Sequence, residues 1–298
     1  MTMKKIGLLL LSSLAFVACS SDDPAQPEPE NPGTDGQMAV NIMTRTDDVP
    51  AVQLQAGLFM VNFHEGKSGE LLAANNYVNN QLLSWTTGGW TTSTPIYWND
   101  MSTSADFYAY APYQTSLTDA RCMPFAVLSD QRTQEAFAQS DFLWGTVKGQ
   151  SPSTQGFDLT LTHMLSQLTV VVTAEAGFDE NELQASDVAV TIGGSKTGCS
   201  VDLSTGMTTP TGSATDVMCL SVGDLSYKAV LIPQQVPFSN LITVDWKGNL
   251  YTLQNSFLLE AGRQYTLTVK LKKTKGGFDI GIAGWDIIDE DFGGVIGG

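Results

Sequence analysis

The sequence predicts an all-β protein made of two tandem β-sandwiches that follow an export signal and a linker. First, apolar residues recur at every second position in many short segments, which is the spacing of a half-buried strand. Second, turn residues separate these segments at intervals of roughly 8 to 12 residues, as in sandwich proteins. Third, the 298 residues include 28 glycines and 12 prolines, which favours many turns over long helices.

Composition and charge exclude two classes of protein. Hydrophobic residues make up 42% and charged residues 15% of the chain, so it is too apolar to be disordered. The formal net charge is -16, and the lysines and arginines are scattered singly. Such a chain repels phosphate backbones, so nucleic acid is excluded as a partner.

Residues 1–18 have the pattern of a secretory signal peptide. Lys4 and Lys5 precede an apolar run that ends at Ala18, and this run is too short for a permanent membrane span. The segment Leu14-Ala15-Phe16-Val17-Ala18-Cys19 resembles a bacterial lipobox, which implies cleavage between Ala18 and Cys19 and acylation of Cys19. Acyl chains such as palmitate would hold the protein on a membrane. The alternative is an ordinary signal peptide with a coincidental cysteine.

Residues 19–36 are predicted to form an acidic, proline-rich linker, because they lack apolar periodicity. Ser20-Ser21-Asp22-Asp23 resembles the export signal of Bacteroides-type lipoproteins that are displayed outside the outer membrane. This resemblance places the protein on the cell surface, anchored in the outer membrane. The alternative is that these residues are simply the start of the linker.

The first sandwich is assigned to residues 37–160. Its predicted strands are residues 38–43, 54–63, 77–85, 90–98, 106–110 and 141–145, with a short helix or loop at 131–139. The second sandwich is assigned to residues 161–298, whose tail could serve as a donor strand. The second series of predicted strands opens at the boundary between the two sandwiches. These strands are residues 157–161, 163–173, Val188–Ile192, 199–203, 217–222, 227–232, 241–246, 251–258, 265–272 and 278–282.

No pattern in the sequence predicts an enzyme, a metal site or a cofactor. The two histidines, His64 and His163, fall in different predicted sandwiches, and His163 is expected to be a hydrogen-bonded structural residue. Nucleophile elbows and phosphate-binding loops are absent from the sequence. Residues 193–198 contain Gly-Gly-Ser-Lys-Thr-Gly, which is interpreted as a hairpin turn.

The cysteines that follow Cys19 are odd in number, so they cannot all pair within the chain. They are Cys122, Cys199 and Cys219. Cys199 and Cys219 could pair across a hairpin or remain as buried thiols.

Aromatic residues gather in the first sandwich and offer an alternative function. Trp85, Trp90 and Trp98 could stack on sugars in a surface glycan-binding lipoprotein. Most of these aromatic residues alternate with polar residues, however, which favours burial in a core.

Several segments together resemble the fimbrillin family, the subunits of Bacteroides-type type V pili. They are the lipoprotein leader, residues 40–45 (VNIMTR), 96–99 (IYWN), 106–112 (DFYAYAP), 141–145 (DFLWG), 159–172 with HMLSQL at their centre, and 282–285 (IAGW) before a glycine-rich tail. The resemblance runs through nearly the whole chain. It implies two transthyretin-like β-sandwiches that assemble by donor-strand exchange.

In that family an Arg-specific protease can cut after the first strand, whose departure opens a groove for a neighbour's strand. The resemblance therefore assigns Arg45 and Thr46 to the scissile bond and residues 38–43, which include Met38, Val40 and Ile42, to the removable strand. The implied partners are other fimbrial subunits and a host or bacterial surface receptor.

Two alternatives remain open within this interpretation. Arg45 could end a strand that stays in place, as would suit an anchor or a non-polymerising subunit. The short apolar segments after Trp285 would make a poor donor strand, which favours an accessory or tip subunit over a stalk subunit.

Overall fold

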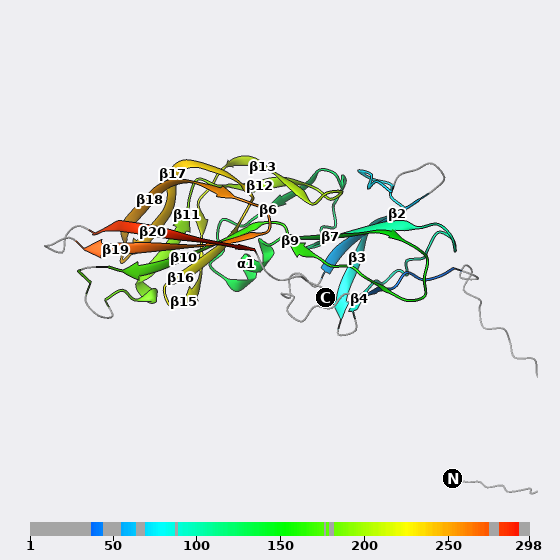
Figure 1. Ribbon diagram of the computed structural model, residues 1–298, viewed down its shortest axis with the longest axis horizontal. Helices are drawn as coiled ribbons and strands as arrows, with labels where there is room; N and C mark the ends of the chain where they lie inside the picture. The colour runs from blue at the N-terminus through cyan, green and yellow to red at the C-terminus, as the bar shows by residue number, and fades with distance from the viewer. Residues whose placement is uncertain are drawn as a thin grey trace, which may run out of the picture. The chain divides into compact units, whose positions relative to one another are not determined.

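A six-stranded antiparallel sheet forms the centre of the first half of the chain (Figure 1). The computed structural model describes residues 37–43, 55–63, 69–86, 89–175, 177–178, 182–273 and 280–291. In lateral order, the six strands are β4 (Gly89–Thr91), β3 (Val78–Thr86), β2 (Gln55–Asn62), β5 (Ala105–Ala111), β7 (Leu143–Gln150) and β9 (Thr162–His163).

Both faces of this sheet are covered, because β5 is buried at every position and β2 at all but its first. Residues 38–43, which we call the first strand, cover one face. The last two of them form β1 (Ile42–Met43), which pairs in parallel with β8 (Phe157–Asp158). The side chains enclosed there, which we call the first core, include Ala56, Leu58, Met60, Trp90, Ile96, Trp98, Ala105, Phe107 and Leu159.

The opposite face is covered by a helix and a second, smaller sheet. The helix α1 (Gln134–Gln139) begins after Thr133, whose hydroxyl accepts a hydrogen bond from the Ala136 amide at 3.1 Å. The sheet has the order β13 (Met207–Ala214), β12 (Lys196–Asp202) and β6 (Met123–Ala126). The cluster between these layers, which we call the middle core, includes Phe59, Tyr108, Tyr110, Phe125, Phe137, Phe142, Val201, Val230 and Ile232.

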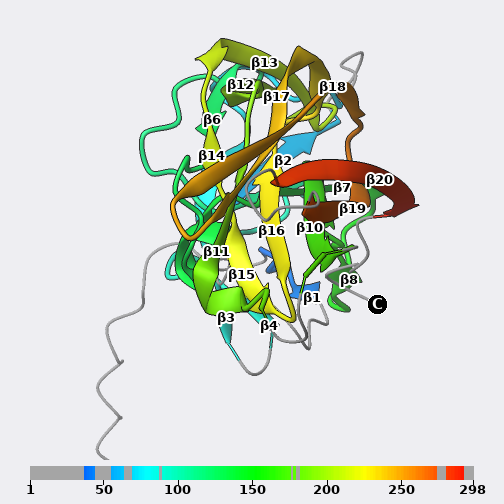
Figure 2. The ribbon, with the colours of Figure 1, turned by 90° about the vertical axis from the view of Figure 1, so that its left-hand side faces the viewer.

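Two further sheets form a sandwich in the second half of the chain (Figure 2). One has the order β15 (Leu220–Gly223), β16 (Ser226–Leu231), β10 (Ser166–Ala174), β19 (Arg263–Lys273) and β20 (Ile280–Asp291). The other has the order β14 (Val217–Met218), β11 (Val188–Ile192), β17 (Gln234–Trp246) and β18 (Asn249–Leu259), with a 3₁₀ helix at Ala185–Asp187 before β11. They enclose the last core, which includes Leu168, Val170, Ile192, Val244, Leu267, Val269 and Leu271.

The residues from Gln37 onward form one compact unit. Buried residues of the first core lie between positions 56 and 161, and those of the last core between 168 and 271. The middle core, by contrast, takes residues from both sides of position 160. The division into sandwiches at 37–160 and 161–298 therefore stays a prediction, and the signal at 1–18 and linker at 19–36 lie outside the described residues.

The predicted all-β class with sandwiched sheets is confirmed, although individual predictions differ from the structure. The predicted strand at 90–98 contains only β4 and a single antiparallel bridge between Tyr97 and Ala39. The predicted hairpin turn at 193–198 is wrong, because β12 begins within this segment, at Lys196, and belongs to a different sheet from the preceding β11. A Cβ on Gly193 would lie 2.4 Å from the Asn240 carbonyl oxygen, so glycine is required by close packing there.

Candidate functional site

The first strand lies between two segments that do not otherwise pair with each other. On one side, the Val40 amide donates to the Ile96 carbonyl at 2.8 Å, and the Trp98 amide donates to the Met38 carbonyl at 2.9 Å. On the other side, the Phe157 amide donates to the Asn41 carbonyl at 3.2 Å. Removing the first strand would therefore leave unpaired backbone on both sides.

Side chains of the first strand alternate between the core and the solvent. Met38, Val40 and Ile42 are half-buried and pack against the first core, whereas Ala39 and Asn41 are exposed. This alternation follows from the two-residue repeat of a strand that has one covered face. Full burial of such an apolar side chain is worth about 1.5–3 kcal/mol, so three half-buried ones contribute about 3 kcal/mol together.

The surface beneath the first strand is strongly apolar. Leu58, Met60 and Phe107 are fully buried there. Phe107 lies 4.5 Å from the Phe157 ring and 5.6 Å from the Trp98 ring, measured between ring centroids. The first strand thus covers an apolar surface that includes aromatic rings, and its loss would leave a groove there with exposed strand edges.

Four predicted site residues lie outside the described residues, namely Ala18, Cys19, Arg45 and Thr46, and so does His64.

The tryptophans proposed for sugar stacking are directed mainly into the first core. Trp90 and Trp98 are buried, and Trp85 is half-buried against the same core. Trp85 and Trp90 pack edge to face with ring centroids 5.5 Å apart. Because a sugar must reach an open ring face, this packing removes support from the glycan-binding alternative.

His163 forms a structural pair, in line with the interpretation from sequence. Its Nδ1 atom lies 2.7 Å from an Asp141 carboxylate oxygen, and both side chains are largely buried where β7 and β9 meet. The described residues contain no group of three or more acidic, histidine or cysteine side chains that could hold a metal ion. In the part of the chain that the structure describes, no helix has the length and hydrophobicity needed to cross a membrane.

Cys122, Cys199 and Cys219 are all free thiols. Burial raises the pKa of Cys199 to about 12 and raises that of Cys219 still further, so both remain protonated and unreactive at neutral pH. Cys122 is exposed, and its sulfur lies 3.1 Å from the Ser200 hydroxyl oxygen.

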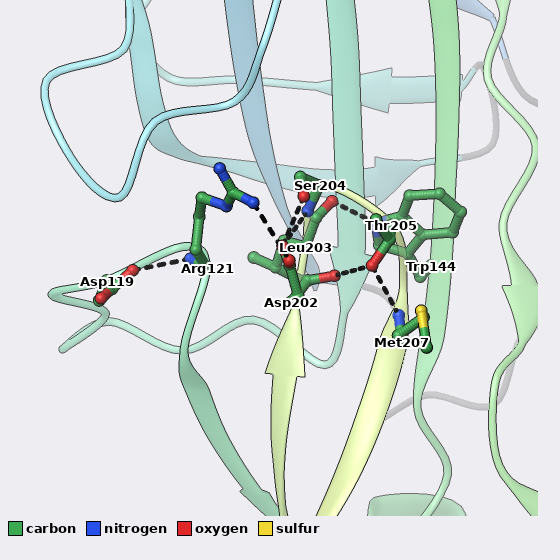
Figure 3. A network of polar contacts seen from close by, with 8 residues as sticks. All are labelled: Asp119, Arg121, Trp144, Asp202, Leu203, Ser204, Thr205 and Met207. Atoms are coloured by element: carbon green, nitrogen blue, oxygen red, sulfur yellow. Dashed lines mark hydrogen bonds and ion pairs between the residues drawn. The ribbon is translucent and has the colours of Figure 1, made fainter.

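A polar network at the β12–β13 turn connects the two halves of the chain (Figure 3). The Trp144 indole N–H donates to the Leu203 carbonyl at 2.7 Å, and the Arg121 guanidinium lies 3.6 Å from an Asp202 carboxylate oxygen. Asp202 also accepts hydrogen bonds from the amide and hydroxyl of Ser204. Local sequence pattern does not predict this network, because its partners are far apart along the chain.

Comparisons with known proteins agree with this architecture. A model of fimbrillin-like proteins matches residues 44–285. The curated protein Fim1C of Bacteroides ovatus, assigned as a fimbrium tip subunit, is 26% identical over 190 residues, a match that covers 56% of this chain and 34% of that protein. The chain thus spans about a third of the length of the curated relative it matches.

Solved structures show the same fold. A protein of Bacteroides uniformis assigned to cell adhesion is 20% identical with a TM-score of 0.65, covering 88% of this chain and 100% of that one. A second such protein, from Bacteroides ovatus, is 17% identical with a TM-score of 0.61, covering 86% and 96%. Because the family model extends over well more than half of the sequence, from residue 44 to residue 285, the chain belongs to the fimbrillin-like family.

Proposed function

We propose that the protein is a fimbrial subunit that releases its first strand and accepts a strand from a neighbouring subunit in its place. Family membership supports the general role of a fimbrial subunit or adhesin. The proposal of strand exchange rests on how the first strand is bound. It lies between segments 96–98 and 157–158, and its alternating side chains cover an apolar surface. An incoming strand would restore both the backbone hydrogen bonds and the covered core.

Cleavage after Arg45 would make this exchange favourable by mass action. In the intact chain the first strand is tethered, so it returns to the groove at an effective concentration on the order of millimolar. After cleavage it is a separate segment held by about 3 kcal/mol of side-chain burial and few hydrogen bonds. A strand with a longer alternating pattern can then replace it.

Pairing within a strand makes Arg263 a poor protease site, and the polar, proline-containing sequence that follows Arg45 supports Arg45 as the site of cleavage. Arg132 makes two hydrogen bonds to Asp130 at 2.8 and 2.7 Å, and Arg263 lies within the paired strand β19. Arg121 lies near Asp202, and its amide donates to an Asp119 carboxylate oxygen at 2.8 Å. Proteases require extended, accessible backbone, which the pairing of β19 denies at Arg263, whereas Arg121 and Arg132 are exposed and make only surface contacts.

Limited digestion with an Arg-specific protease tests the proposal. We expect the wild-type protein to yield a new N-terminus at Thr46, identified by mass spectrometry, and to form higher oligomers in size-exclusion chromatography. Arg45→Ala should prevent both changes, whereas the matched control Arg132→Ala should prevent neither. Cleavage that leaves a stable monomer would count against strand exchange.

We also propose that Cys19 carries the lipid that anchors the protein in the outer membrane, displayed on the cell surface. The lipobox resemblance at residues 14–19 supports this proposal. Metabolic labelling with a palmitate analogue should mark the wild-type protein, whereas Cys19→Ser should remove the label and release the protein from the membrane fraction. Cys122→Ser is the matched control and should retain the label.

The position of the subunit in the fimbrium is proposed to be accessory or at the tip. The short apolar segments after Trp285 support this position, as does the assignment of the partly matching Bacteroides ovatus relative to a tip. Immunogold labelling of fimbriae should then mark the ends of filaments, and uniform labelling along the shaft would contradict the proposal. Such a position leaves room for a receptor on a host or bacterial surface.

A further inference from the structure

Two buried polar side chains near the first strand lack hydrogen-bond partners. Asn62 is 5% exposed, and neither its amide nitrogen nor its amide oxygen is hydrogen-bonded. Trp98 is 2% exposed, and its indole nitrogen is also unpartnered among the residues that the structure describes. Buried polar groups in native proteins are almost always hydrogen-bonded, so two such groups in one apolar core need an explanation.

Strand pairing places both groups on the same side of the six-stranded sheet. Asn62 follows Met60 by two residues and pairs with Ala105, so its side chain points into the first core, as those of Met60 and Ala105 do. Phe107, which pairs with Met60, is the diagonal neighbour of Asn62 on that face. The Trp98 ring packs edge-on against Phe107 from the opposite layer.

The direction of the first strand places Met38 over this region. Ile42 lies at the other end of the first strand, and its carbonyl oxygen is close to Gly89 of β4. β4 pairs with the end of β3, and this end of β3 also pairs with the start of β2. The strand therefore runs from the Asn62 end of β2 towards its beginning. Met38 lies opposite Trp98, as their backbone hydrogen bond shows, and both side chains face the first core.

We propose that Asn62 and Trp98 form a polar subsite of the groove, which selects donor strands carrying an amide side chain at the position of Met38. This inference rests on the proposed strand exchange. Methionine fits the space but offers only a weak acceptor and no donor. Glutamine has a similar length, and its carbonyl can accept from the Trp98 indole while its amino group donates to the Asn62 oxygen. The partner is thus a strand that is apolar at alternate positions, except for one amide.

A double-mutant cycle in the intact protein tests the subsite without requiring strand exchange. Met38→Gln should be tolerated when Asn62 is present and strongly destabilising when Asn62→Leu removes the polar partner. We expect the cycle, measured by urea denaturation, to show at least a fivefold coupling in the equilibrium constant for unfolding. A smaller coupling overturns the subsite. Val40→Thr is the control for a polar group elsewhere in the same strand, and it should show no such coupling with Asn62→Leu.

Peptide competition tests the same subsite in trans, and it decides the question if the Asn62→Leu protein does not fold. Protein cut after Arg45 is offered a synthetic peptide of residues 37–45 or the same peptide with Met38→Gln. We expect the glutamine peptide to bind at least fivefold more tightly, and equal or weaker binding overturns the subsite. If neither peptide binds, strand exchange itself is contradicted, and the cycle in the intact protein still decides whether the subsite exists.

Discussion

The first and last strands of the described chain are attached to the molecule in very different ways. The first strand has one bridge to Tyr97 and a two-residue parallel ladder with β8. The last strand, β20, pairs with β19 along the whole of the latter, from Arg263 opposite Asp291 to Lys273 opposite Ile280. Long pairing favours a permanent element, whereas short pairing favours one that can be exchanged.

The neighbours of the two strands differ as well. β19 is a central strand between β10 and β20, and its residues Leu267, Val269 and Leu271 are fully buried. The first strand instead pairs with residues 96–98, which lie outside any long strand, and with the two-residue β8. The last strand therefore pairs along a buried central strand, whereas the first strand has only short pairing partners where it packs against the first core.

Truncation should give the largest difference between these two regions. Removing residues 274–298 deletes β20 and exposes the edge of β19, so we expect no cooperative thermal transition in circular dichroism. Removing residues 1–45 deletes the first strand and should leave a folded protein with a lower midpoint. The opposite ranking of the two truncations would contradict the comparison.

Matched deletions of side-chain volume should separate the regions by a smaller amount. Leu267→Ala in β19 leaves a cavity in a fully buried site and should cost about 2–5 kcal/mol in the free energy of unfolding. Ile42→Ala, at a half-buried site, should cost about half as much. Urea denaturation followed by tryptophan fluorescence measures both, and equal losses would show that the first strand is as integral as β19.

Hydrogen exchange should detect the weaker attachment in the unmodified protein. The Val40 amide, bonded to the Ile96 carbonyl, should exchange through local opening of the first strand. The amides of β19 that bond to its neighbours should exchange only through global unfolding. We expect protection to differ by a factor on the order of 100, measured by mass spectrometry of peptides, and similar protection would remove the distinction.

The smallest effect is expected at Asn41, whose side-chain amide donates to the Thr154 carbonyl at 3.2 Å on the exposed side of the first strand. Asn41→Ala should lower the free energy of unfolding by less than about 1 kcal/mol, because solvent replaces the lost hydrogen bond. It should nevertheless speed release of the strand after cleavage at Arg45, measured by the rate of peptide exchange. Unchanged release would show that this bond does not hold the strand.

Local sequence pattern predicted most strands, because their buried faces impose a two-residue repeat. Val188–Ile192 lies where the pattern placed it. β6 and β13 were missed, since they are the outer strands of a small sheet and contain Pro124 and Pro210. Edge strands need fewer apolar residues and tolerate proline, so they lack the signal on which the prediction depends.

The candidate site was predictable in part for the same reason. The sequence predicted a strand at residues 38–43 that includes Met38, Val40 and Ile42, and the structure places all three side chains against the first core. Their neighbours at Tyr97 and Phe157 were not predictable, because no local pattern states which distant segments will lie beside a strand. The missing hydrogen-bond partners of Asn62 and Trp98 could not be predicted either, because they depend on which distant residues surround each side chain.

The middle core has a mechanical consequence for a subunit that works within a filament. Tension entering through the groove under the first strand would pass across aromatic side chains such as Tyr108 and Tyr110 into Val201 and Val230 of the second half. The hydrogen bond from the Trp144 indole to the Leu203 carbonyl also connects the two halves of the chain there. Under tension, the first strand, with its short pairing, should therefore detach before the two halves separate at the middle core.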